Sequence, residues 1–96
     1  MTQIQIKQLT DLQKKELGLP EICQAHGAWS VWECDASSFD WHYDELEEAY
    51  FYEGDVIVKT KEGQAKIKAG DFVTFPAGLS CTWTIIKKVR KVYSFQ

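Results

Sequence analysis

The sequence predicts one all-β domain, built as a sandwich or barrel. Apolar and polar residues alternate along several short stretches, which is the pattern of half-buried strands. Turn residues such as Gly, Pro and Asp separate these stretches at intervals of roughly six to ten residues, as in sandwiches and barrels rather than in βαβ folds. With 96 residues, of which 45% are hydrophobic, the chain has the size of one domain with one core. We therefore expect a single domain over residues 1–96.

The N-terminal part predicts a short strand followed by a helical turn. Ile4 and Ile6 alternate with polar neighbours, which indicates an edge strand. Residues 11–17 follow a helical pattern, with Thr10 or the next residue as the cap and Gly18 as the end signal. A single helical turn or two turns fit this length.

A second strand is expected from residue 28. Trp29 and Val31 fall on one face of it, and Trp32 and Cys34 on the other. A strand with aromatic residues on both faces is buried on both sides or lies at a dimer contact. Residues 35–38 are polar and are expected to form a connection.

The second half of the chain predicts a series of strands separated by tight turns. Gly54 and Gly63 supply the positive φ that turns at residues 53–55 and 61–63 require. A further turn at residues 69–71 and a break at residues 76–78 complete the series. The expected strands cover residues 47–52, 56–58, 64–68, 72–75, 80–86 and 89–95.

The charge balance argues against nucleic acid as a partner. The formal net charge is −3 and the pI is about 5.3, whereas phosphate binding needs a concentrated basic face. Lys87, Lys88, Arg90 and Lys91 do form a basic run. We expect them to lie at a solvated strand end and turn, with an anion or partner contact as the alternative.

The sequence indicates a reduced, cytoplasmic environment. It has no long apolar run and no signal-peptide pattern at the N-terminus, so we expect no membrane contact. Cys23, Cys34 and Cys81 are odd in number and lack paired spacing. We therefore expect free thiols and a cytoplasmic location.

Two spaced motifs resemble those of the cupin superfamily. Glu47 with Gly54 matches the end of the first cupin motif, and Gly70 with Pro76 and Gly78 matches the start of the second. More widely, the chain resembles the short single-domain cupins grouped with the cupin domain of (S)-ureidoglycine aminohydrolase. The positions that carry this likeness are Phe39-Asp40-Trp41, Tyr43, Glu47, Glu53-Gly54, Gly70-Asp71, residues 74–79, Cys81, Trp83 and residues 89–93.

The resemblance implies a conical jelly-roll β-barrel. Its core would cover about residues 28–95, with the short N-terminal strand and helical turn outside it. Cupins of this kind frequently pair into homodimers through edge strands, so we expect a homodimer. The resemblance implies less about activity, because one fold hosts many functions.

The metal ligands of the superfamily are mostly replaced here. Metal-binding cupins offer two His and a Glu from the first motif and a third His from the second. Trp41, Tyr43 and Cys81 occupy the three His positions, and only Glu47 remains. We therefore expect no metal cofactor. The alternative is a divalent ion held by Glu47, Cys81 and His42, which would require a bulge or a one-residue slip that turns His42 inward.

We expect the barrel to hold a small organic ligand in an aromatic pocket. Alternation places Glu47 and Phe51 on one face of their strand, and Cys81 and Trp83 on one face of another. The expected lining is Trp41, Tyr43, Phe51 and Trp83, with Glu47 and Cys81 as its polar points. Glu47 is either a structural carboxylate bonded to a hydroxyl such as that of Tyr43, or a polar anchor or general acid/base.

Two other functions remain open. The family likeness allows a metal-dependent enzyme of ureide and nitrogen metabolism, for which the sequence assigns no catalytic residues. A structural barrel that acts as a dimer or through protein partners is the third candidate. Exposure of Trp29, Trp32, Tyr50 and Tyr52 on outward faces would favour it, because exposed aromatic patches mark interfaces.

Overall fold

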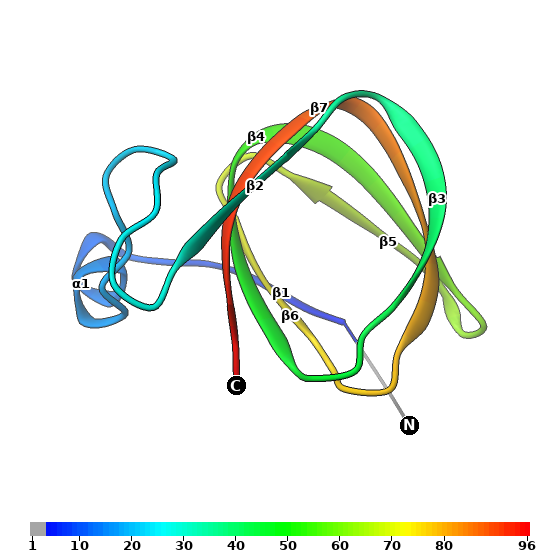
Figure 1. The fold of residues 1–96 in the computed structure, drawn as a ribbon, viewed down its shortest axis with the longest axis horizontal. Coiled ribbons are helices and arrows are strands. Elements are labelled where there is room, and N and C mark those ends of the chain that lie inside the picture. Colours follow the sequence, from blue (N-terminus) through cyan, green and yellow to red (C-terminus); the bar gives the residue numbers. More distant parts are fainter. Residues whose placement is uncertain (1–3) are drawn as a thin grey trace.

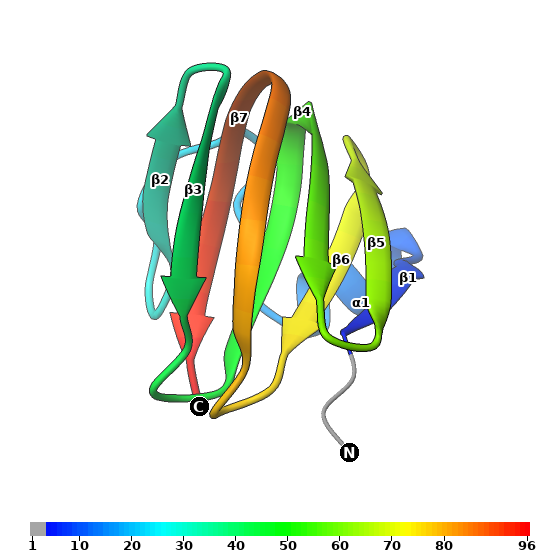
Figure 2. The same cartoon turned by 90° about the vertical axis from the view of Figure 1, so that its right-hand side faces the viewer.

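The computed structural model describes residues 4–96 and confirms the all-β class. The strands close into a barrel, with the single short helix beside it (Figure 1). Figure 2 shows the same strands from the side, with the C-terminus at one end of the barrel. The elements are β1 (Gln5–Gln8), α1 (Asp11–Glu16), β2 (Ser30–Cys34), β3 (Ser37–His42), β4 (Glu47–Thr60), β5 (Gly63–Lys68), β6 (Asp71–Phe75) and β7 (Ser80–Phe95).

Two long bent strands, β4 and β7, join the two walls of the barrel. The first half of β4 pairs with β6 and with the second half of β7. The second half of β4 pairs with β5 and with the first half of β7. On the other side of β7, β3 pairs with its first half and β2 with its second half, and all these pairs are antiparallel. The shared strands thus wrap one core between two facing sheets, as a jelly-roll barrel does.

Two expected breaks between strands are wrong. The turn predicted at residues 53–55 lies within the continuous strand β4, and the two strands predicted at 80–86 and 89–95 are one strand, β7. The register of β4 against β7 shifts several times between Phe51 and Val56, so Gly54 lies in a β-bulge. A bulge bends a strand without ending it, and this bend lets β4 pass from one wall to the other.

The N-terminal segment forms as predicted and covers the outside of one wall. β1 lies at the edge of the sheet, beyond β6. Thr10 caps α1 and exchanges hydrogen bonds with Gln13 in a capping box. Behind α1, a cluster of Trp29, Tyr50, Phe72 and Val92 is buried on the outer face of the wall. No helix within residues 4–96 has the length and hydropathy needed to cross a membrane.

Most of the aromatic residues whose exposure would have favoured a structural barrel are covered by this segment. Trp29 is buried, and its indole N–H donates to the carbonyl oxygen of Leu17 at 2.9 Å. Tyr50 is buried in the same cluster, and the Tyr52 hydroxyl donates to the carbonyl oxygen of Pro20. Trp32 packs against the interior instead. These aromatic residues are therefore not an exposed patch.

The interior of the barrel is filled by a larger cluster. Tyr43, Phe51, Phe75 and Trp83 are its aromatic members, and aliphatic side chains from β4, β5, β6 and β7 complete it. Alternation along β4 and β7 predicted which faces point inward, and both faces are confirmed. One end of the interior leaves space, and that space is the candidate site.

Candidate functional site

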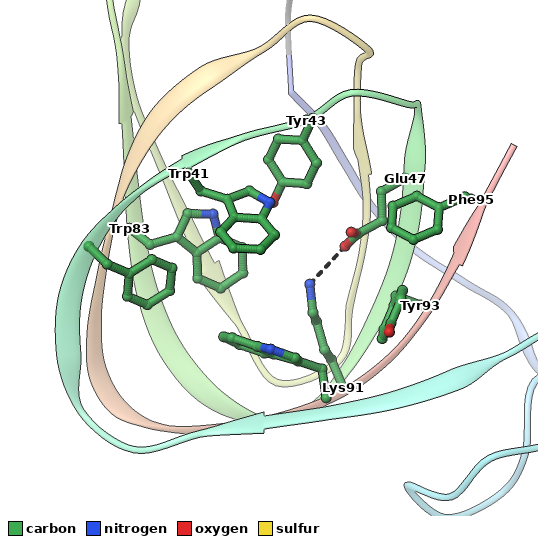
Figure 3. Close-up of a pocket in the computed structure, with 9 residues that line it drawn as sticks. Trp41, Tyr43, Glu47, Trp83, Lys91, Tyr93 and Phe95 are labelled. Carbon is green, nitrogen blue, oxygen red and sulfur yellow. Dashed lines mark hydrogen bonds and ion pairs between the residues drawn. The ribbon is translucent and has the colours of Figure 1, made fainter.

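A cavity of about 120 Å³ lies where β3 and β7 end and β4 begins (Figure 3). Its wall is almost entirely aromatic, with one acidic and one basic side chain. The residues that line it are Trp32, Phe39, Trp41, Tyr43, Glu47, Trp83, Lys91, Tyr93 and Phe95. The sequence predicted four of these, namely Trp41, Tyr43, Glu47 and Trp83.

A buried ion pair forms the polar part of the cavity. Lys91 Nζ donates to Glu47 Oε2 at 2.7 Å, and both side chains are only 6% exposed. Figure 3 shows the two side chains meeting across the cavity, Glu47 from β4 and Lys91 from β7. The predicted partner for Glu47 was a hydroxyl such as that of Tyr43. Among the hydrogen bonds of residues 4–96, the partner is Lys91 instead.

Aromatic rings surround the ammonium group on its other sides. Lys91 Nζ lies 4.9 Å from the ring centroid of Trp83 and 5.1 Å from that of Trp32. The rings of Phe51, Phe75 and Tyr93 lie within 5.7 Å. Such rings attract a cation by their quadrupole but replace little of its hydration. Burial therefore lowers the pKa of Lys91, and the charge and hydrogen bond of Glu47 oppose this shift.

Lys91 is the charged site residue that the sequence analysis missed, together with the lining aromatic residues Trp32, Phe39, Tyr93 and Phe95. The basic run was expected to be solvated, which is wrong for Lys91. Lys87, Lys88 and Arg90 do lie at the surface, where they pair with acidic side chains. Alternation could have separated Lys91 from them, because Val89, Lys91 and Tyr93 share the inward face of β7.

Tyr43 and Trp83 are the fully buried aromatic residues that line the cavity. The Tyr43 ring stacks on Phe75, with centroids 4.7 Å apart and planes at 6°. Burial raises the pKa of the Tyr43 hydroxyl most, and the negative charge of Glu47 raises it further. The Trp83 indole N–H is near this hydroxyl, but it is buried without a well-formed hydrogen bond in residues 4–96. An unpaired buried donor beside a cavity is available to a ligand acceptor.

Phe51 and Cys81 do not line the cavity. Phe51 packs behind it, 6.2 Å from Trp83 by ring centroids. The Cys81 thiol lies in the core cluster and contacts the carbonyl oxygen of Trp41. The residue also borders a separate shallow groove with His42 and Ser80. Burial raises the pKa of Cys81 to about 11. The thiol is therefore a poor nucleophile at neutral pH.

Comparison with known proteins places the chain in a family. Residues 24–93 match the family model described as the EutQ-like cupin domain. The chain belongs to this cupin family. No match is found among the curated proteins compared.

Solved structures agree with the assignment of this cupin. A DUF861 family protein from Thermotoga maritima is 39% identical, with a TM-score of 0.87, over 98% of this chain and all of that one. A EutQ protein from Clostridium difficile is 18% identical with a TM-score of 0.64, over 70% of the cupin chain and 53% of its own. A putative ethanolamine utilization protein from Salmonella typhimurium is 20% identical with a TM-score of 0.63, over 96% and 68% of the two chains. The last two share the fold, and the cupin spans about half of the Clostridium difficile chain.

The donor atoms of this cupin do not match the metal site that its fold implies. His42 is exposed on the outer side of β3, where its Nδ1 lies 2.7 Å from Ser80 Oγ. It is therefore not brought together with Glu47 and Cys81. Residues 4–96 contain no group of three or more His, Cys, Asp or Glu side chains placed to hold a metal ion. The one carboxylate in the cavity already faces the ammonium of Lys91, whose charge would repel a divalent ion.

Proposed function

We propose that this cupin binds a small, uncharged, planar organic molecule between the aromatic side chains of the cavity. The observation that carries the proposal is the Glu47–Lys91 pair, buried at the base of an otherwise aromatic pocket. Small-molecule sites commonly combine an apolar wall with a few polar groups that orient the ligand.

The charges of the pair favour a neutral ligand. Glu47 and Lys91 together carry no net charge, so an ionic ligand would leave one buried charge without a partner, which is costly. The ammonium has three N–H donors, and the hydrogen bond to Glu47 uses one of them. That contact is to Oε2, so Oε1 of Glu47 can accept a hydrogen bond from the ligand. A carboxamide or ureido group offers the matching acceptor and donor side by side.

The volume of the cavity limits the ligand to about one ring. An apolar protein cavity of about 150 Å³ holds benzene, and the present cavity measures about 120 Å³. Trp41 and Phe95 are each 50% exposed and line the cavity as well, so a substituent can extend past them into solvent. We propose that binding needs no metal, since the Lys91 ammonium supplies the positive charge beside Glu47.

An enzyme acting on a ureide is the second candidate. The resemblance to (S)-ureidoglycine aminohydrolase implies a substrate with a ureido group, and Glu47 with Lys91 could orient such a group. Glu47 would then serve as the proton acceptor. Release of ammonia from a ureide by the wild-type protein, absent in Glu47→Gln, would favour this candidate over simple binding.

Binding of four one-ring compounds tests the proposal. We expect benzamide and phenylurea to bind at least about tenfold more tightly than benzoate and benzylamine, because a tenfold change is only about 1.4 kcal/mol and an unpaired buried charge costs more. Isothermal titration calorimetry measures the affinities. Glu47→Gln should weaken benzamide binding, whereas Glu48→Gln on the same strand should not. No binding at millimolar concentration, or equal affinity for all four compounds, would refute the proposal.

A further inference from the structure

We propose that Lys91 is a nucleophilic amine that forms a reversible imine with a small aldehyde. The inference rests on the proposed function, because the aldehyde would occupy the same cavity. It adds a covalent step that binding alone does not require. The chemical class of ligand is an aldehyde with one ring or a short apolar chain.

The geometry singles out Lys91 among the lysines. Its Nζ lies in the cavity that the aromatic side chains line, with Glu47 as its hydrogen-bond partner. Lys87 and Lys88, on the same strand, extend from the surface and are 76% and 54% exposed. Burial among rings therefore distinguishes one amine from solvated neighbours of the same chemistry.

The amine has to be neutral to attack, and Glu47 can take its proton. The two groups are joined by a hydrogen bond of 2.7 Å, so the proton moves along an existing contact. A neutral amine beside a carboxylic acid needs less solvation than the ion pair, so an aromatic enclosure lowers the cost of this proton transfer. Burial also lowers the pKa of Lys91, which makes loss of its proton easier. Burial is a known route to lysines that form Schiff bases.

The step balances with groups that the site contains. Lys91 Nζ gives one proton to Glu47 and its free electron pair forms a bond to the carbonyl carbon. The carbonyl oxygen receives that proton from Glu47, which gives a carbinolamine. Glu47 then takes the second N–H proton and delivers it to the leaving hydroxyl, so water departs and the C=N bond forms. No oxidant or reductant takes part, and Glu47 ends in its starting form.

Reductive trapping tests the inference on the full chain. Benzaldehyde at low molar excess with sodium cyanoborohydride at pH 7 converts each imine into a stable benzyl amine, which intact mass and peptide mapping locate. We expect a benzyl group on Lys91, formed faster than on Lys88, because the cavity holds the aldehyde beside the Lys91 amine and Glu47 accepts its proton. Equal labelling of the two lysines, or labelling of exposed lysines alone, would overturn the inference.

Matched variants separate the covalent step from binding. Lys91→Arg should abolish the benzyl group while keeping a cation beside Glu47, and Lys88→Arg should leave labelling of Lys91 unchanged. Benzamide should protect Lys91 by competition. If benzamide binds but Lys91 stays unlabelled, the imine is refuted and the binding function stands. If Lys91 is labelled but benzamide does not bind, the imine stands and the neutral-amide proposal fails.

Discussion

Lys91 and Glu47 depend on each other for their burial. Each loses most of its hydration in the cavity, and each has the other as its hydrogen-bonded counter-ion. Removing one partner leaves the other as a buried charge, which costs about 3–5 kcal/mol, whereas replacing both with apolar groups is often neutral. The pair is therefore a constraint on stability as well as the polar part of the site.

We predict that Lys91→Met lowers the free energy of unfolding by about 3–5 kcal/mol. The double variant Lys91→Met with Glu47→Leu should recover most of this loss, because no buried charge remains. Urea denaturation measures both. Lys88→Met is the control, since its exposed pair with Glu33 at 3.6 Å should contribute no more than about 1 kcal/mol. A loss below about 1 kcal/mol in Lys91→Met would contradict the burial of a charged amine.

Cys81 gives a prediction for alkaline pH. Burial raises the pKa of its thiol from 9.0 to about 11. Above pH 9 the unfolded chain therefore loses this proton while the folded chain keeps it, so stability falls as pH rises toward 11. Cys81→Ala should remove this contribution. The difference in unfolding free energy between wild type and variant should shrink between pH 9 and 11, measured by urea denaturation with reductant, and a constant difference would contradict the assignment.

The residue scale also shows what sequence reasoning can find in such a site. Glu47 was identified from its motif, together with the requirement that a buried carboxylate has a partner. The partner was missed because Lys91 stands in a basic run. The clustering of charges along the sequence does not distinguish a lysine that points inward from one that points outward. Only the strand alternation through Val89 and Tyr93 distinguishes Lys91.

At the scale of the strands, Gly54 and Gly63 show why faces are predicted better than breaks. Both have positive φ, 123° and 137°. Gly63 begins β5 after a hairpin turn, as expected, whereas Gly54 lies in the bulge of β4. The two sequence contexts are alike, because each glycine follows a glutamate and lies between two strand-like stretches, which fits a turn and a bulge equally. What separates them is contact with β7, which is distant in sequence.

Gly54→Ala should therefore destabilise the protein more than Gly63→Ala. A Cβ at Gly54 would lie 2.9 Å from the Cα of Val89, whereas a Cβ at Gly63 would meet nothing within 4 Å. Both variants share the backbone strain of about 1–3 kcal/mol, and Gly54→Ala adds about 1–3 kcal/mol of overpacking. Thermal and urea unfolding measure the difference. Equal losses would show that the close approach of β4 and β7 relaxes without cost.

For the whole molecule, the family likeness and the alternation together predicted the barrel and four of the residues that line its cavity, but not that the cavity lies at one end. They could not predict what covers the outer wall. Trp29 and Tyr50 lie on an outward face, but the chain's own segment before β2 packs over them. A pattern of alternating residues shows that a face is apolar and leaves open which part of the molecule, or which partner, covers it.

The covered outer wall restricts how a homodimer could form. Without an exposed aromatic patch there, the strand edges that the family likeness points to are the route we expect. The strands with a free edge, β1, β2, β3 and β5, are four to six residues long. Edges this short bury little surface, and small interfaces are commonly weak. We predict a dimer of twice the 11.1 kDa chain mass at high concentration that dissociates toward one chain at about micromolar concentration. Light scattering across a dilution series measures this mass. A single-chain mass at every concentration would exclude the dimer, and a dimer that persists at nanomolar concentration would require a larger interface than these edges offer.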